Sequence, residues 1–317
     1  MTLHGLAAPA PARTETAKTT ARTTEATEFR LLGPVAVYDR QTGTGITPSG
    51  PKQRALLATL VVHAGEQLSV DRLVEELWGD RPPANAPSAL HTHVARLRRL
   101  LPAPGHEWIS TLPTGYLLSL GRASTDVARF TRLSGQGRAA APQDPRHATR
   151  LLGQALALWQ GAALQDSSHG PLCTAEADRL EEQRLTTLEA LYEASLNCGR
   201  HTEIVGDLER LTTAHPLRER PYDLLMVALY RCGRQSEALG VYERARRRLV
   251  GALGVEPGPA LRCRLEAILN HCPTLTPSRP HHPDLATEAA RLQARIDQLV
   301  REQADLMRRI QEQDAGR

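Results

Sequence analysis

Apolar positions in the first part of the chain change their spacing along the sequence. Residues 29–38 (FRLLGPVAVY) form a nearly continuous apolar run, which is typical of a strand with Pro34 at an edge or a bulge. A turn over residues 39–45 and the short stretch 46–48 then predict a returning strand. Three segments with the apolar spacing of helices follow. Two short apolar stretches around a Pro-Thr-Gly turn close the region and predict a β-hairpin.

Capping residues place the bounds of these helices. Ser69 and Asn85 are residue types that cap helix N-termini, whereas Gly79 and Pro102 are types that end helices. The expected helices cover residues 51–64, 69–79 and 85–102, and the hairpin pairs residues 108–112 with 116–120. Strands, three helices and a hairpin in this order predict a winged helix-turn-helix.

The second half of the chain reads as helical from residue 126 to about residue 270, after a boundary at residues 121–125. Its sequence repeats: the tripeptide Cys-Gly-Arg at Cys198 recurs at Cys232, and Glu203 recurs as Glu237, each at an offset of 34 residues. This is the tetratricopeptide period, in which each unit is a helix–turn–helix. The fold class is therefore mostly α: an N-terminal winged helix-turn-helix with small β-sheets, an all-α tetratricopeptide-like domain and a C-terminal helix.

The two ends of the chain have a different character. Residues 1–28 have no apolar period and are expected to form a disordered leader. A Pro-rich spacer over 271–283 precedes a heptad pattern over 284–317, with Leu at position d and mostly Ile or Ala at position a. This helix either forms a parallel two-stranded coiled coil or packs on its own repeat domain. The expected division is thus 1–28, 29–122, 123–270, 271–283 and 284–317.

Composition narrows the function classes. Among 317 residues, 39 are basic and 35 acidic, and only Lys18 and Lys52 are lysines. Arginine content by itself is therefore weak support for nucleic-acid binding, and only the location of the arginines in the fold can indicate it. Five cysteines without a C-x-x-C pair favour a reduced, cytoplasmic protein, and no apolar run approaches the 18 residues of a membrane span. Motifs for catalysis, cofactors or metals are missing, so no catalytic, cofactor-binding or metal residue is expected.

The third predicted helix carries the candidate chemistry. Leu90, Val94 and Leu97 share one face, which we assign to the core. The helix holds three arginines and no acid, and a helix of this width fits the major groove, where Arg reads guanine edges. The hairpin and the start of the first helix offer further contacts to phosphates. The candidate DNA-binding residues are Thr92, Arg96 and Arg99, then Ser88, His91, Arg98, Lys52, Arg54, Thr111 and Thr114.

The chain resembles the Streptomyces antibiotic regulatory protein (SARP) family. In the N-terminal part the resemblance rests on residues 51–57 (PKQRALL), 69–73 (SVDRL), 77–80 (LWGD) and 96–101 (RLRRLL). In the helical part it rests on residues 155–161 (ALALWQG), 216–220 (PLRER), 228–235 (ALYRCGRQ) and 253–259 (LGVEPGP), which look like the bacterial transcriptional activation domain. The third helix and wing differ from the common family pattern at His91, Thr92, Thr111 and Thr114, so the family's DNA preference does not transfer.

The resemblance implies an OmpR-type winged helix followed by a tetratricopeptide-like activation domain. It also implies a pathway-specific activator of a secondary-metabolite gene cluster. Such an activator binds direct repeats near promoters as head-to-tail protomers or a homodimer, and it recruits RNA polymerase with its principal sigma factor. Two alternatives remain open from the residues themselves: a repeat-domain interaction scaffold, and a regulator gated by a small ligand in the concave face of the repeats.

Overall fold

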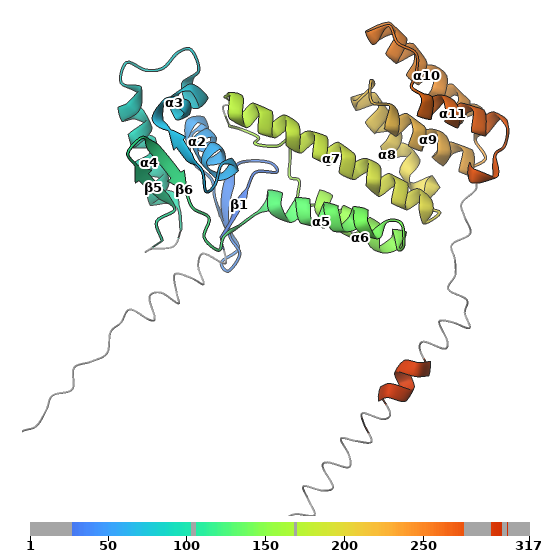
Figure 1. Cartoon of the computed structure of the whole chain (residues 1–317), viewed down its shortest axis with the longest axis horizontal. Helices are drawn as coiled ribbons and strands as arrows, with labels where there is room; N and C mark the ends of the chain where they lie inside the picture. Colours follow the sequence, from blue (N-terminus) through green and yellow to red (C-terminus); the bar gives the residue numbers. More distant parts are fainter. Residues whose placement is uncertain (1–26, 103–105, 168–169, 276–292, 300–302, 304–317) are drawn as a thin grey trace, which may run out of the picture. The chain divides into compact units, whose positions relative to one another are not determined.

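The computed structural model describes residues 27–102, 106–167, 170–275, 293–299 and 303. Four strands form a sheet in the order β3-β2-β1-β7, of which Figure 1 labels the strand β1. Its strands are β1 (Thr27–Arg30), β2 (Ala36–Asp39), β3 (Thr44–Ile46) and β7 (Ser124–Thr125). Strands β1, β2 and β3 pair antiparallel in sequence order, whereas β7 pairs parallel to β1.

This sheet corrects two predictions. The single strand expected over residues 29–38 is wrong, because the chain turns between β1 and β2, and Pro34 in that turn forms an isolated bridge with Gln165. The leader expected through residue 28 extends too far, because Thr27 and Glu28 belong to β1 and are buried. The Glu28 carboxylate tolerates burial because the Arg40 guanidinium donates to it at 2.5 Å. The remainder of the predicted leader lies outside the described residues.

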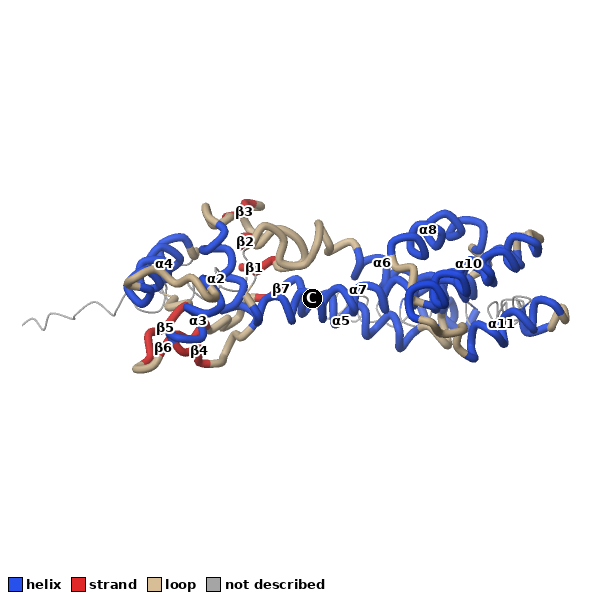
Figure 2. Tube along the Cα trace, turned by 90° about the horizontal axis from the view of Figure 1, so that it is seen from above, coloured by secondary structure: helices blue, strands red, loops and turns tan. Residues whose placement is uncertain are grey.

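Three helices follow: α2 (Pro51–Val62), α3 (Val70–Trp78) and α4 (Ala86–Leu100). The predicted caps are in place: the Ser69 hydroxyl accepts from the Arg72 amide at 3.2 Å, and the Asn85 side chain accepts from the Ser88 amide at 3.3 Å. Helix α2 ends two residues earlier than predicted. A second sheet, β4-β6-β5, joins β4 (Gln67–Ser69) to the predicted hairpin of β5 (Ile109–Leu112) and β6 (Gly115–Leu118). Figure 2 shows the two groups of strands apart from each other.

The helical part begins with α5 (Asp126–Ala140), α6 (Pro145–Leu156) and α7 (Pro171–Asn197). It continues with α8 (His201–Ala214), α9 (Glu219–Arg231), α10 (Gln235–Leu253), α11 (Pro259–Leu269) and a 3-10 turn η1 (Pro273–Leu275). Helix α5 packs along α6, and α9 packs against α8, α10 and α11. No helix in the described ranges is long and apolar enough to cross a membrane.

The chain forms two compact units that divide between residues 194 and 195, inside α7, and not at residue 122. The reason is packing: Leu164 and Cys173 are fully buried in the same hydrophobic cluster as the winged-helix core. The Cys173 thiol lies 3.3 Å from the Thr59 hydroxyl of α2, and burial raises its pKa to about 12. The boundary at residue 122 therefore remains a sequence-based division, while the first compact unit includes the winged helix and most of α5–α7.

Two buried carboxylates, Glu76 and Asp126, connect the winged helix to these helices, and we call them the capping carboxylates. Glu76 at the end of α3 accepts from the backbone amides of Leu172 and Cys173, at 2.8 and 2.9 Å, in the first turn of α7. Asp126 at the start of α5 accepts from the amides of Leu31 and Leu32, all at 2.9 Å, after β1. Each carboxylate thus satisfies backbone donors that burial would otherwise leave unpaired.

Asp126 makes the stability of the first unit depend on pH. Burial raises its pKa to about 6 from 3.8, against the opposing effect of the hydrogen bonds from Leu31 and Leu32. Between these two values the folded state holds a proton that the unfolded state has lost, so the free energy of unfolding falls as pH rises. We expect wild type to lose about 2–3 kcal/mol relative to Asp126→Asn between pH 3.5 and 6.5. Urea titrations of both proteins across this range measure the difference, and a constant difference would contradict the assignment.

The 34-residue repeat corresponds to two equivalent turns. Gly199 and Gly233 both have φ of +76°, and each tripeptide closes its turn with the same three backbone hydrogen bonds. In both copies the arginine pairs with a glutamate three residues later, Arg200 with Glu203 and Arg234 with Glu237. The predicted helix–turn–helix units are therefore present, and each Gly lies at a helix end.

A matched pair of glycines tests this geometry. Ala at Gly233 has to adopt a left-handed conformation, so Gly233→Ala is expected to lower stability by about 1 kcal/mol. Gly240 lies inside α10 with open space where a Cβ would lie, so Gly240→Ala is expected to raise stability by about 0.5–1 kcal/mol. Thermal unfolding of the two variants shows which substitution lowers stability and which raises it. Equal effects would mean that the repeat turn does not require glycine.

The C-terminal heptad pattern falls almost entirely outside the described residues. Residues 293–299 are helical, and Ile296 and Leu299 in this stretch are 52% and 50% exposed. The predicted coiled coil over residues 284–317 stays a prediction.

Candidate nucleic-acid interface

Helix α4 has one buried and one exposed face. Ala86, Leu90, Val94 and Leu97 are buried in or near the winged-helix core, as the apolar spacing predicts. Five exposed polar residues lie away from the buried stripe, and we call them the recognition face: Ser88, Thr92, Arg96 and Arg99 opposite the stripe, and His91 at its shoulder. Because α4 contains no acid, this face offers cations and hydrogen-bonding groups with no carboxylate between them.

The two arginines of the recognition face are available to a ligand. Arg96 forms no hydrogen bond or ion pair with any residue that the structure describes, and Arg99 only approaches the Ala95 carbonyl at 3.4 Å. The Thr92 hydroxyl donates to the Ser88 carbonyl at 3.0 Å, so its lone pairs point outward as acceptors. The face thus combines two guanidinium donors with one hydroxyl acceptor.

Arg98 lies at the side of α4 and has a different role. It is half-buried, and its guanidinium donates to the Ile109 carbonyl at 2.7 and 2.9 Å and to the Thr111 hydroxyl at 2.7 Å. These contacts hold the hairpin against α4. Arg98 and Thr111 are therefore engaged with each other, and a DNA contact by either one stays a prediction.

The other hairpin residue, Thr114, accepts a hydrogen bond from the Gln67 side chain of β4. It remains exposed in the turn between β5 and β6, at the tip of the hairpin. Its predicted contact with phosphate is compatible with this exposure. The structure does not test it.

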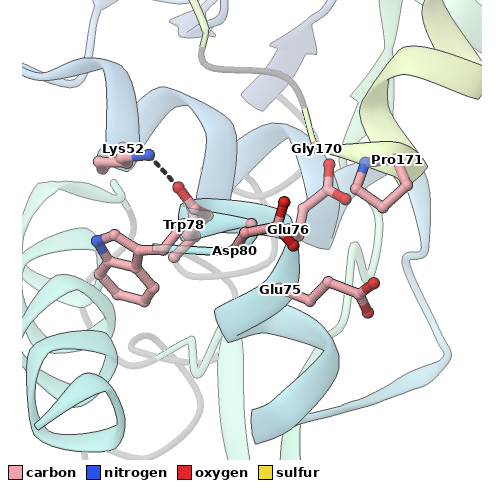
Figure 3. A pocket seen from close by; sticks show the side chains of 9 residues that line it. Lys52, Glu75, Glu76, Trp78, Asp80, Gly170 and Pro171 are labelled. Atoms are coloured by element: carbon pink, nitrogen blue, oxygen red, sulfur yellow. Dashed lines mark hydrogen bonds between the residues drawn. The ribbon is translucent and has the colours of Figure 1, made fainter. Parts of the chain in front are cut away.

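Lys52 and Arg54 at the start of α2 are occupied by the protein itself. The Lys52 ammonium donates to the Leu77 carbonyl at the end of α3, as the dashed line in Figure 3 shows. Arg54 donates to the carbonyls of Asp166, at 2.6 Å, and Pro48, at 3.0 Å. Both side chains therefore satisfy helix or loop carbonyls, and their predicted phosphate contacts would have to compete with these bonds.

The pocket beside Lys52 does not favour an anion. It has a volume of 430 Å³ and lies between α3 and the start of α7. Figure 3 shows the carboxylates of Glu75 and Glu76 on the side of Gly170 and Pro171, and Asp80 also lines the pocket. Three carboxylates line the pocket beside one lysine that already donates to a carbonyl, which makes the pocket negative. Phosphate is therefore expected at the recognition face and not in this pocket.

His93 lies on α4 next to the recognition face but points toward α3. Its ring is 6.0 Å from that of Trp78, and its buried Nδ1 has no hydrogen-bond partner among the described residues. Burial, with smaller contributions from Arg96 and Lys52, lowers the pKa of His93. The lowered pKa of His93 favours the neutral imidazole, which adds no charge to the interface. Within the described ranges no cluster of His, Cys, Asp or Glu could hold a metal ion.

Sequence reasoning missed the residues that position the interface. Tyr116 of β6 lies 2.9 Å, at its hydroxyl, from Nδ1 of His91. Glu76 fixes α3 to α7 through contacts more than 90 residues apart in the sequence. The Tyr116 position could have been found from its place in the predicted hairpin, since alternate residues of a strand share a face. The sequence around Glu76 gives no sign that its side chain contacts α7.

The fold and the α4 face together define a helix-turn-helix transcriptional regulator, and comparison with known proteins supports this class. Residues 46–118 match the family model of the C-terminal domain of transcriptional regulatory proteins. Residues 125–269 match the model of the bacterial transcriptional activator domain.

Several relatives extend over most of the chain. It is 43% identical to the transcriptional regulator RedD of Streptomyces coelicolor over 78% of this chain and 72% of RedD. It is 36% identical to the regulatory protein DnrI of Streptomyces peucetius over 83% of this chain and 99% of DnrI. A solved structure of Mycobacterium tuberculosis EmbR, in complex with a low-affinity phosphopeptide, aligns with a TM-score of 0.71. That alignment has 36% identity and covers 78% of this chain and 65% of the EmbR chain.

The chain belongs to the SARP family of transcriptional activators. The predicted fold class, an OmpR-type winged helix followed by a helical activation domain, is confirmed.

Proposed function

We propose that the protein activates a secondary-metabolite gene cluster by binding direct repeats near promoters, with α4 in the major groove, and by recruiting RNA polymerase with its principal sigma factor. The observation that carries the proposal is the recognition face: five exposed polar residues, two of them arginines, on a helix without acids. A bidentate Arg–guanine pair contributes about 1–3 kcal/mol of base discrimination. Two such arginines are enough to make binding depend on sequence.

The remaining candidate residues have supporting roles in this proposal. Arg98 and Thr111 fix the hairpin beside α4, and Thr114 at the hairpin tip reaches the neighbouring phosphates. Lys52 and Arg54 stabilise α2 and its surroundings, and they contribute to DNA affinity only as positive charges at a distance. Sequence preference thus comes from α4 alone.

The arrangement of protomers follows from the DNA. Direct repeats place successive α4 helices in the same orientation, so protomers bind head to tail, and the C-terminal heptads over residues 284–317 add self-association. Of the two alternatives, an interaction scaffold predicts no salt-dependent DNA affinity. A ligand-gated regulator requires a ligand site in the concave face of the repeats, and the 430 Å³ pocket beside α3 and α7 is not such a site.

Selection from random duplexes by the full chain tests the binding mode. We expect enrichment of two copies of one motif in the same orientation, about one helical turn (~10–11 base pairs) apart. Inserting five base pairs between the copies should abolish cooperative binding, because it rotates the second site to the opposite side of the duplex. Inverted copies would contradict head-to-tail binding. No enrichment, together with salt-independent binding, would favour the scaffold.

Polymerase recruitment has its own test. Run-off transcription from a promoter carrying the selected repeats, with RNA polymerase and its principal sigma factor, should rise when the protein is added. The Arg96→Ala/Arg99→Ala double variant should give no stimulation, whereas Arg132→Ala, which alters an exposed arginine on α5, should behave as wild type. Normal DNA binding without stimulation would contradict recruitment and leave the binding proposal intact.

A further inference from the structure

We propose that Tyr116 is a positioning residue for DNA readout: its hydroxyl fixes the tautomer of His91 so that Nε2–H of His91 donates to an acceptor on a base edge in the major groove. The inference rests on the proposed DNA-binding function and assigns a role to a pair of residues within it. Its basis is one contact, because Tyr116 Oη lies 2.9 Å from Nδ1 of His91 and the two ring centroids are 6.4 Å apart.

The two partners differ in exposure, which gives them different roles. Tyr116 is only 4% exposed and belongs to the winged-helix core, whereas His91 is exposed on the recognition face. Tyr116 is therefore inaccessible to DNA bases, and it acts on DNA through His91. The second ring nitrogen of His91, Nε2, has no hydrogen-bond partner among the residues that the structure describes.

The tyrosine is held firmly by its sheet. It lies in β6, the central strand of β4-β6-β5, opposite Leu68 on one side and Thr111 on the other. Arg98, two helical turns after His91, binds the Ile109 carbonyl and the Thr111 hydroxyl of β5. Two side chains on one side of α4, His91 and Arg98, thus attach the helix to the hairpin sheet.

This contact determines where the imidazole proton lies. A phenol is a stronger acid than a neutral imidazole N–H, and an imidazole nitrogen is a stronger acceptor than a phenol oxygen. The Tyr116 hydroxyl therefore donates to Nδ1, and the single proton of the neutral ring resides on Nε2. His91 then presents a donor to the DNA.

A donor at this position selects among bases. Purine N7, guanine O6 and thymine O4 are acceptors in the major groove, whereas the cytosine amino group is a donor. Nε2–H of His91 donates to any of these acceptors, and it has no partner opposite the cytosine amino group. Because His91 lies only five residues before Arg96 on the same helix, the base it reads belongs to the same half-site.

The first measurement concerns the tautomer and needs no DNA. Long-range proton–nitrogen correlation spectra of the full chain with ¹⁵N-histidine distinguish the two ring tautomers, and His91→Gln identifies the signal. We expect wild type to show the Nε2–H form of His91, and Tyr116→Phe to shift the signal toward a mixture. An unchanged His91 signal in Tyr116→Phe would overturn the inference.

The second measurement is binding to duplexes in which each base pair of the selected motif is changed in turn. Tyr116→Phe should lose about three- to tenfold of discrimination at one position, the effect of a single hydrogen bond, with unchanged affinity for scrambled DNA. In the His91→Gln background the same substitution should have no effect, because a glutamine amide is a donor without a tautomer to set. Equal weakening on all duplexes would assign the Tyr116 hydroxyl a phosphate or structural role and overturn the inference.

The chain supplies a matched control. Tyr230 and His271, in the repeat domain, form a second tyrosine–histidine pair with Oη 3.3 Å from Nδ1 and ring centroids 6.3 Å apart. Tyr230→Phe should leave base discrimination unchanged, and a loss equal to that of Tyr116→Phe would overturn the inference. If wild type binds all duplexes equally, the proposed sequence-specific DNA binding itself fails. If wild type discriminates and Tyr116→Phe does so equally, only the role of Tyr116 fails.

Discussion

Replacing Arg96 or Arg99 with alanine is expected to remove sequence preference while leaving the protein folded. Both side chains are exposed, and neither holds another element in place, so the fold loses nothing but solvated surface. Each substitution should cost about 1–3 kcal/mol of specific binding, equivalent to roughly 5- to 150-fold in the dissociation constant. Fluorescence anisotropy with the selected duplex and a scrambled duplex measures this loss.

The control for this prediction is Arg98→Ala. Its guanidinium holds the hairpin, so the expected effect is a lower melting temperature together with weaker binding to both duplexes. An Arg96→Ala/Arg99→Ala variant that still distinguished the two duplexes as wild type does would show that α4 does not read the bases.

The other large expected effect concerns Glu76. Its carboxylate is 2% exposed and accepts the amides of Leu172 and Cys173 at the N-terminus of α7. In Glu76→Ala these donors stay buried without a partner, so we expect the first compact unit to lose about 2–4 kcal/mol of stability. Gly170 adds a steric constraint, because a Cβ there would lie 2.4 Å from the Glu76 carbonyl oxygen.

Urea unfolding and amide hydrogen exchange measure this effect. Exchange at Leu172 and Cys173 should accelerate in Glu76→Ala, since both amides lose their acceptor. Glu75→Ala is the matched control, because the Glu75 side chain is exposed on the preceding position of α3, and it should change stability by less than about 0.5 kcal/mol. Equal stability of the two variants would contradict the role assigned to Glu76.

Local signals predicted the helices of the interface well. The Ser69 and Asn85 caps and the spacing of Leu90, Val94 and Leu97 each depend on residues within one or two helical turns, and the structure has them as predicted. The same spacing placed Thr92, Arg96 and Arg99 on one exposed face. Periodicity is sufficient here because a helix with a buried stripe has only one outward side.

The features that the sequence did not reveal depend on contacts between distant segments. Strand β4 has three residues and exists because Leu68 pairs with Tyr116 across the sheet. The boundary expected at residues 121–125 gives no sign that Asp126, which immediately follows β7, accepts from the amides after β1. The basic helix start predicts Lys52 as a phosphate ligand, and it gives no sign that the ammonium also donates to a carbonyl of another helix. No local pattern contains such partners.

Methylation interference at the selected repeats tests the central claim, that the recognition face of α4 reads bases in the major groove. Dimethyl sulfate methylates guanine N7 in the major groove and adenine N3 in the minor groove. If α4 reads bases in the major groove, N7 methylation of particular guanines in each repeat blocks binding of wild type, and one of these guanines no longer matters for Arg96→Ala. Interference confined to adenine N3, or an identical guanine pattern for wild type and Arg96→Ala, would contradict this claim.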